Sequence, residues 1–235
     1  MSSIPVVFVP ALGADERLWQ PVIDRLGDGV RAHVLRGNGA SIADMADDIL
    51  ARAPREFYLA GISMGGYVSL DIALRGTGRV RGLALVNTSA IAAPEDKRQN
   101  SLGLIDMIGS GGFEQAADLV SGAVAPHRPD VVETAGSMVR TLGADVLRDQ
   151  QLAVLDRRDR RAELDTIDVP TVILVGSADT IIPPELGAEL AAGIAGAELV
   201  SVDGAGHFSP LEDPAAVAAA LTAWLDRAES RSAAR

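Results

Sequence analysis

Short apolar runs alternate with longer amphipathic stretches along most of the chain. Runs dominated by apolar residues stand at 6–9, 32–35, 57–60, 83–86, 172–175 and 199–202. Between most of them, apolar residues recur every three to four positions over helical lengths, as at Leu18, Val22 and Leu26. Strands that alternate with helices predict a mostly parallel sheet with helices on both faces. We therefore expect one α/β domain over residues 1–235.

One long segment breaks this alternation. Between about residues 91 and 168 no convincing strand occurs, and the apolar spacing is helical, with interruptions at 109–112 (Gly-Ser-Gly-Gly) and 126–129 (Pro-His-Arg-Pro). The pattern predicts three or four short helices inserted between the fourth and fifth strands. We expect them to form a small helical cap over the functional edge of the sheet; an ordinary helical layer is the alternative.

Composition and charge narrow the class of partner. The chain has 48% hydrophobic residues, a formal net charge of −11 and no cysteine. This negative charge disfavours nucleic acid as a partner, and the apolar runs are too short for the ~20 residues of a membrane span. The first residues carry no basic segment or cleavage site, so we expect a cytoplasmic location. A monomer or weak homodimer is the expected oligomeric state.

A serine flanked by glycines follows the third predicted strand. The sequence Gly-Ile-Ser-Met-Gly occupies residues 61–65, and helical spacing resumes directly after it. A serine on so tight a strand-to-helix turn is strained and lifts its hydroxyl clear of the sheet edge, which requires glycine two positions before and two after it. Ser63 is therefore the candidate nucleophile.

A nucleophilic serine needs a histidine base, and the chain has three histidines. His33 lies inside the second predicted strand, where a buried or edge role is expected. His127 lies in the proline-flanked loop of the insertion, where a surface or cap-lining role is expected. His207 stands in a glycine-containing loop directly after the last predicted strand. This position favours His207 as the general base.

The base needs a carboxylate that orients it. Asp179 follows the fifth predicted strand, whereas Asp203 lies four residues before His207 and is expected to brace that loop as a turn residue. The carboxyl ends of parallel strands meet at one edge of a sheet, so Ser63, Asp179 and His207 are expected to converge there. We therefore favour Asp179 as the acid.

Two backbone N–H groups are candidates for an oxyanion hole. Met64 opens the helix behind the serine, so its N–H has no partner within the helix. The loop at residues 10–13, Pro-Ala-Leu-Gly, follows the first strand, and Gly13 lets the chain turn back so that the N–H of Leu12 can serve.

These features resemble the α/β-hydrolase superfamily, in particular its small single-domain bacterial serine hydrolases. The similar segments are the loop at 10–13, the turn at 61–65, the acid loop at 176–179 and the histidine loop with Glu-Asp-Pro at 212–214. The resemblance implies six parallel strands in the order 2-1-3-4-5-6 and a compact helical cap. Many relatives carry His-Gly where this chain has Pro10 and Ala11, but the oxyanion hole uses main-chain donors, so the loop at 10–13 is still expected to supply one.

The resemblance implies a serine hydrolase that cleaves a carboxylic ester, thioester or lactone of a small to medium acyl group through an acyl-enzyme. No metal or organic cofactor is implied, because no dinucleotide loop or paired histidine ligands occur. A carbon–carbon bond hydrolase, a cofactor-free perhydrolase and a ligand-binding receptor remain alternatives. A serine nucleophile disfavours epoxide opening and dehalogenation, which relatives perform with an aspartate.

Substrate-binding residues are expected at Trp19, Ile105 and Met138. Ile105 lies on an apolar helix face that could wall an acyl pocket, although such a face also packs a cap onto a core. The basic run at 157–161 (Arg-Arg-Asp-Arg-Arg) has two readings: a solvated helix face, or an anchor for an anionic substrate tail at the cap rim.

Overall fold

The computed structural model describes residues 4–233, which contain one six-stranded parallel sheet in the order β2-β1-β3-β4-β5-β6. Both the strand order and the fold class match the sequence-based expectation and are confirmed. The strands are β1 (Val6–Val9), β2 (Ala32–Val34), β3 (Phe57–Ile62), β4 (Val80–Val86), β5 (Thr171–Gly176) and β6 (Glu198–Val202).

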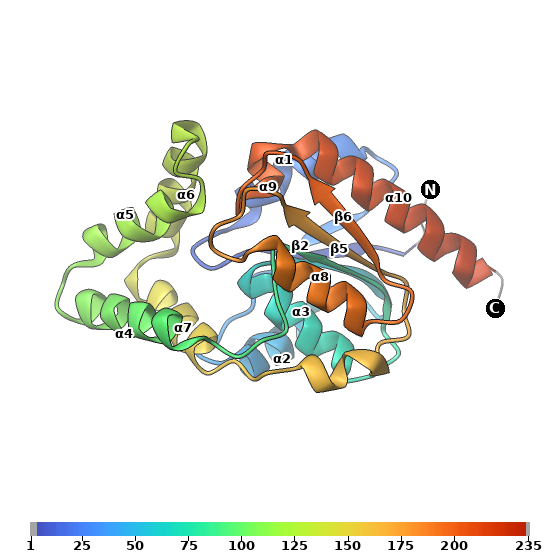
Figure 1. Cartoon of the computed structure of the whole chain (residues 1–235), viewed down its shortest axis with the longest axis horizontal. Helices are drawn as coiled ribbons and strands as arrows, with labels where there is room; N and C mark the ends of the chain where they lie inside the picture. The colour runs from blue at the N-terminus through green and yellow to red at the C-terminus, as the bar shows by residue number, and fades with distance from the viewer. Residues whose placement is uncertain (1–3, 234–235) are drawn as a thin grey trace.

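Helices cover both faces of the sheet (Figure 1). One face is covered by α1 (Gln20–Leu26) and α10 (Pro214–Ala233), and the other by α2 (Ile42–Arg52), α3 (Met64–Leu74) and α8 (Pro184–Gly193). The short helices η1 (Glu16–Leu18) and α9 (Ser209–Glu212) complete this part of the chain. None of the helices within residues 4–233 is long and apolar enough to cross a lipid bilayer.

The central strands β1, β3 and β5 are buried at every residue, and β4 is buried except at Arg81, because helices cover both faces of the sheet. Along β1, Val6 and Phe8 enter the core under α1 and α10, while Val7 and Val9 enter the core under α2 and α3. The edge strand β2 is only partly buried, and His33 is exposed on it. The alternation of side chains on a pleated strand thus divides one sequence between two cores.

Four α-helices lie between β4 and β5 and extend to one side of the sheet (Figure 1). They are α4 (Glu95–Gly109), α5 (Phe113–Val124), α6 (Pro129–Leu142) and α7 (Ala144–Leu155), and the 3₁₀ helix η2 (Arg161–Thr166) leads back to β5. We call residues 95–155 the cap. Within the cap α4 packs on α7, and α5 packs on α6. A small apolar cluster that includes Ile108, Ala117 and Leu147 holds these helices together.

Candidate active site

Ser63 occupies a strained turn between β3 and α3. Its φ is 54° and its ψ is −119°, a backbone conformation that non-glycine residues rarely adopt. A Cβ atom on Gly61 would lie 2.2 Å from the carbonyl oxygen of Gly65, and one on Gly65 would lie 2.3 Å from the carbonyl oxygen of Val9. Only glycine fits at both positions, so the chain packs tightly enough to present the Ser63 side chain at the sheet edge.

A continuous line of hydrogen bonds joins the three side chains that the sequence singled out. His207 Nε2 lies 2.9 Å from Ser63 Oγ, and His207 Nδ1 lies 2.8 Å from Asp179 Oδ2. His207 and Asp179 are each only 4% exposed. The three residues come from the ends of three different strands, β3, β5 and β6. With Nδ1–H donating to the carboxylate, Nε2 is free to accept the Ser63 proton.

Asp179 is held as a carboxylate despite its burial. Its Oδ1 accepts the backbone N–H groups of Ile181 (2.8 Å) and Ile182 (3.0 Å). Burial acts to raise the pKa of the Asp179 carboxyl, but hydrogen bonds from His207, Asn87 and the Ile182 N–H, together with the His207 charge, outweigh it, so the pKa is lowered. The group therefore stays ionised and can orient the imidazole.

Asn87 belongs to the same network and was missed by the sequence reasoning. Its Nδ2 donates to Asp179 Oδ2 (2.8 Å) and to the Gly206 carbonyl (3.1 Å), and its Oδ1 accepts the Ser209 hydroxyl (2.7 Å). It adopts a left-handed φ of 44°, which asparagine tolerates better than most residues. The sequence contains one feature that could have identified Asn87: it directly follows the fourth strand, at the sheet edge where Ser63, Asp179 and His207 lie.

The loop that carries His207 is braced by Glu212. The Glu212 carboxylate accepts the N–H of Gly206 at 2.8 Å and the N–H of Phe208 at 3.0 Å, on either side of the histidine. Asp203 is exposed, and its Oδ1 accepts the hydroxyl of Ser177 at 3.4 Å. The structure therefore pairs Asp179, and not Asp203, with the imidazole.

The two residues that are expected to supply the oxyanion donors lie at the same cavity. Leu12 and Met64 both line it, next to Ser63 and His207. The N–H of Gly13, which follows Leu12, donates to the side-chain Oε1 of Gln150 at 2.8 Å. Gln150 is fully buried on α7, so a cap side chain fixes the loop that carries one of the two donors.

The cavity has a volume of about 800 Å³ and lies between the sheet edge and the cap. Leu104 and Met107 of α4 and Val120 of α5 line it from the cap, and Ile182 and Leu186 line it from the β5 side. Most of this lining is apolar, as expected for a pocket that holds the hydrocarbon part of a small molecule.

Two expected substrate-binding residues belong to the core instead. Trp19 is fully buried, packs on Phe8 with ring centroids 5.0 Å apart, and donates its Nε1–H to the Val9 carbonyl at 3.2 Å. Met138 is fully buried in the core under α6. Neither lines the cavity, and this corrects the expectation for both: aromatic and methionine side chains at helical spacing fill cores as readily as they line pockets.

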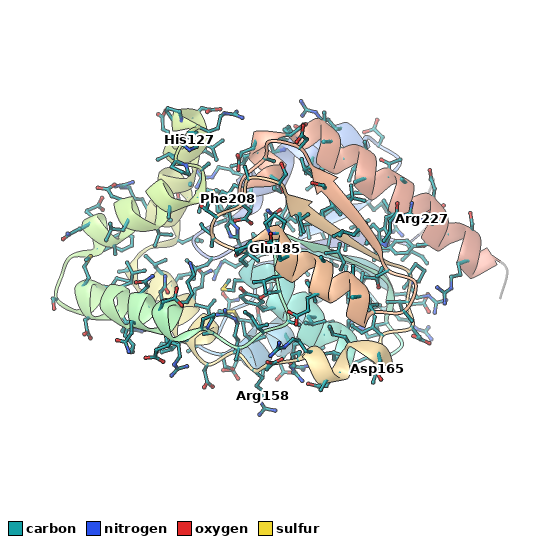
Figure 2. The ribbon with its side chains drawn as sticks, viewed as in Figure 1. His127, Arg158, Asp165, Glu185, Phe208 and Arg227 are labelled. Atoms are coloured by element: carbon teal, nitrogen blue, oxygen red, sulfur yellow. The ribbon has the colours of Figure 1, made fainter. Side chains whose placement is uncertain are left out.

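Ile105 is partly buried on α4, but its neighbours Leu104 and Met107 line the cavity in its place. Part of the expected apolar face thus lines the cavity, through Leu104, whereas Ile108 of the same face packs inside the cap. His127 is exposed in the loop between α5 and α6 and does not line the cavity (Figure 2). Its neighbour Arg128 donates from Nη1 to the Glu212 carbonyl at 3.1 Å. Within residues 4–233, no three His, Asp or Glu side chains come together as they would around a metal ion.

A parallel sheet with a strained serine turn and a histidine–carboxylate pair at its edge defines the α/β hydrolases. The chain belongs to the alpha/beta hydrolase family, whose model matches residues 6–220. It is an ester-hydrolysing enzyme of the carboxylesterase-like type.

Named relatives agree with this class. The chain is 29% identical over 231 residues to a pimeloyl-[acyl-carrier protein] methyl ester esterase of Neisseria meningitidis, covering 91% of this chain and 90% of that protein. Among solved structures, a thermophilic esterase from Thermogutta terrifontis is 25% identical with a TM-score of 0.86, covering 97% and 91% of the two chains. An enol-lactonase from Burkholderia xenovorans (23% identity, TM-score 0.83, covering 96% and 92%) shares the fold.

Proposed function

We propose that the enzyme hydrolyses carboxylic esters through an acyl-enzyme formed on Ser63. His207 acts as the general base and acid, Asp179 orients the imidazole, and the N–H groups of Leu12 and Met64 bind the oxyanion. The observation that supports this proposal is the line of hydrogen bonds at 2.9 Å and 2.8 Å from Ser63 through His207 to Asp179.

In the first half of this mechanism, Ser63 Oγ attacks the ester carbonyl carbon while His207 Nε2 accepts the hydroxyl proton. The carbonyl oxygen becomes an oxyanion between the two N–H donors, each worth about 2.7–4 kcal/mol of barrier in a well-studied case. The carbon–oxygen bond to the alcohol then breaks, and His207 returns the proton to the leaving alkoxide.

In the second half, water takes the place of the alcohol. His207 accepts a proton from the water as its oxygen attacks the acyl carbon, and a second oxyanion forms in the same place. The bond to Ser63 Oγ breaks, the serine recovers its proton from the imidazolium, and the carboxylic acid leaves. Asp179 stays ionised throughout and stabilises the imidazolium in both halves.

The proposed substrate is an ester of a small to medium acyl group with a small alcohol. The cavity of about 800 Å³, whose lining is mostly apolar, suits such an acyl chain. The name of the Neisseria relative, a methyl ester esterase, supports a small leaving alcohol. The esterase names of the relatives also favour ester hydrolysis over carbon–carbon cleavage or peracid formation.

The test compares wild type with Ser63→Ala on p-nitrophenyl esters from acetyl to dodecanoyl and on the matching methyl esters. Loss of the nucleophile should lower kcat by about 10⁴-fold or more. The exposed serine Ser230 on α10 provides the control, because Ser230→Ala should keep wild-type turnover. A fluorophosphonate should label only the peptide that contains Ser63. Equal turnover by wild type and Ser63→Ala would contradict the proposal.

A further inference from the structure

The active-site cavity contains two cationic side chains that pair with no carboxylate. Lys97, the single lysine of the chain, lies in the first turn of α4, and Arg157 follows α7. Both line the cavity that holds Ser63 and His207. Among the described residues, neither forms an ion pair. The chain has a net charge of −11, so carboxylates are abundant, yet none within residues 4–233 pairs with these two cations. Their shared position in one cavity indicates that they bind an anionic ligand.

Arg157 is held in place without being neutralised. Its guanidinium carbon lies 4.6 Å from the centroid of the Tyr67 ring, its Nε donates to the Ile91 carbonyl at 3.2 Å, and its Nη1 donates to the Val154 carbonyl at 2.7 Å. Nη2 has no hydrogen-bond partner among residues 4–233. Carbonyl oxygens and an aromatic face orient the planar group but leave its full charge available.

Tyr67 places this cation close to the reaction. It lies one helical turn after Ser63, and its backbone N–H donates to the Ser63 carbonyl at 3.1 Å. Burial raises the pKa of the Tyr67 phenol, with the Arg157 charge acting in the opposite direction, so the ring stays neutral at physiological pH. No phenolate is therefore present to neutralise Arg157.

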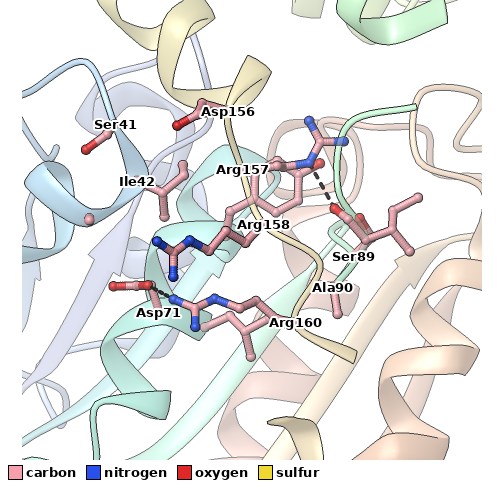
Figure 3. A pocket seen from close by; sticks show the side chains of 13 residues that line it. Ser41, Ile42, Asp71, Ser89, Ala90, Asp156, Arg157, Arg158 and Arg160 are labelled. Atoms are coloured by element: carbon pink, nitrogen blue, oxygen red, sulfur yellow. Dashed lines mark hydrogen bonds and ion pairs between the residues drawn. The ribbon is translucent and has the colours of Figure 1, made fainter. Parts of the chain in front are cut away.

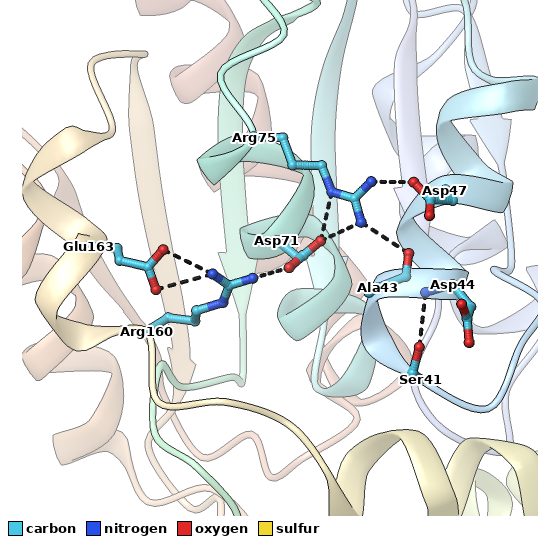
Figure 4. Close-up of polar contacts among 8 residues, drawn as sticks. All are labelled: Ser41, Ala43, Asp44, Asp47, Asp71, Arg75, Arg160 and Glu163. Atoms are coloured by element: carbon cyan, nitrogen blue, oxygen red, sulfur yellow. Dashed lines mark hydrogen bonds and ion pairs between the residues drawn. The ribbon is translucent and has the colours of Figure 1, made fainter.

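The other arginines of the 157–161 run have different environments. Arg160 pairs with the buried Asp71 of α3 and with Glu163, and Asp71 also pairs with Arg75 at 2.8 Å (Figure 4). Arg161 pairs with Asp159 and Glu189. These two arginines fasten the segment that follows the cap to α3 and α8, so they are structural.

Arg158 differs from Arg157 in exposure and in direction. It is exposed and lines only a second, smaller cavity of about 320 Å³. Figure 3 shows its guanidinium on the side of Asp71 and that of Arg157 on the side of Ser89. Arg158 is thus a neighbouring arginine outside the active-site cavity, which makes it a matched control.

We propose that Lys97 and Arg157 form an anion subsite for a carboxylate at the end of the acyl chain, so that the enzyme prefers half-esters of dicarboxylic acids. The ammonium of Lys97 and the free Nη2 of Arg157 supply charge-assisted hydrogen bonds, which are stronger than neutral ones. The described residues that line this cavity include a single carboxylate, Asp96, which is exposed. The two cations therefore give the subsite a net positive charge. This inference rests on the proposed esterase function.

The test uses monomethyl esters of dicarboxylic acids, from glutarate to suberate, and their neutral ω-carboxamides of the same length. Hydrolysis is followed by pH-stat titration at low and high salt. For the best chain length, wild type should show a kcat/KM about tenfold higher for the carboxylate than for the carboxamide. Salt should reduce this ratio because it screens the attraction between the charges.

Three variants assign the preference to its residues. Lys97→Met and Arg157→Met should each lower the carboxylate-to-carboxamide ratio by about threefold to tenfold, mainly through KM, and Arg157→Lys should restore part of it. Arg158→Met should keep the wild-type ratio. A wild-type ratio of one at low salt, or a ratio unchanged in both methionine variants, would overturn the subsite.

The same assay separates this inference from the proposed function. If wild type hydrolyses the carboxamide esters and Ser63→Ala does not, the esterase function stands whatever the ratio is. If Ser63→Ala retains turnover of both ester types, the proposed mechanism fails and the ratio no longer concerns the same site.

Discussion

The sheet edge and the cap meet at one cavity, and they differ in how completely their polar groups are satisfied. At the sheet edge, Asp179 accepts bonds from side chains and backbone, and Glu212 holds the histidine loop at two points. On the cap side, Lys97 and the Nη2 of Arg157 have no partner within residues 4–233. The hydrogen-bonded groups at the sheet edge hold the catalytic side chains in one geometry. The cationic groups on the cap side remain free to bind a ligand.

The two regions also differ in how much space surrounds their glycines, and substitutions there should have the largest effects on stability. Gly65→Ala at the sheet edge would place a Cβ atom 2.3 Å from the Val9 carbonyl oxygen and 2.5 Å from that of Pro10. Because both neighbours are backbone, the strand and the oxyanion loop must move, and we expect a loss of about 3 kcal/mol or more of unfolding free energy. Urea unfolding monitored by circular dichroism measures this loss.

Gly122→Ala in α5 of the cap is the matched substitution. Nothing lies within 4 Å of a Cβ atom at this exposed helical position, so alanine should raise the free energy of unfolding by roughly 0.5–1 kcal/mol. The comparison between the two regions breaks down if the two variants shift the unfolding midpoint by similar amounts in the same direction.

Gln150 is where the cap acts on the sheet edge, and its substitution should have the next largest effect. Gln150→Met keeps the shape of the side chain but removes the acceptor for the Gly13 N–H, which lies 2.8 Å away and is buried. Losing a buried hydrogen bond costs about 1–2 kcal/mol. Because the loop carries an oxyanion donor, we expect kcat to fall about tenfold while KM changes little.

A positioning role for Gln150 has a signature that loss of stability lacks. Binding of an alkyl trifluoromethyl ketone, which forms a tetrahedral adduct with the serine, should weaken in parallel with kcat. Gln150→Glu keeps an acceptor oxygen at the same position and should recover part of kcat. A Gln150→Met variant whose KM rises while kcat and inhibitor affinity stay at wild-type values would show that the cap does not position the loop.

The residues at the sheet edge could be predicted because parallel topology and local turn chemistry suffice to place them. The prediction of Ser63 relied only on the glycine spacing after a strand. The prediction of Asp179 and His207 relied only on the rule that the carboxyl ends of parallel strands share one edge. Asn87 obeyed the same rule, but an asparagine after a strand is also an ordinary turn residue, so its position alone did not single it out.

The cap residues could not be predicted because their roles depend on packing between helices. Helical spacing shows which residues share a face, yet it does not show whether that face meets a cavity or a core. Met138 therefore lies in the core while Leu104 and Met107 line the cavity. Likewise, four arginines in the run at 157–161 look alike in sequence, and only the fold separates Arg157 from the paired Arg160.

The smallest expected effect concerns how pH acts on the sheet edge through Asp179. Its pKa is lowered in the folded state, so between that value and the ordinary value near 3.9 the unfolded chain binds more protons than the folded protein. The stabilisation from this carboxylate is therefore complete above about pH 5 and is lost as the pH falls through the folded-state pKa.

Asp179→Asn, which cannot titrate, should lose less unfolding free energy between pH 6 and pH 3 than wild type does, as measured by urea titrations. Ser63→Ala keeps the carboxylate and should follow wild type. Parallel curves for wild type and Asp179→Asn would show that the hydrogen bonds at the sheet edge do not favour the ionised carboxylate.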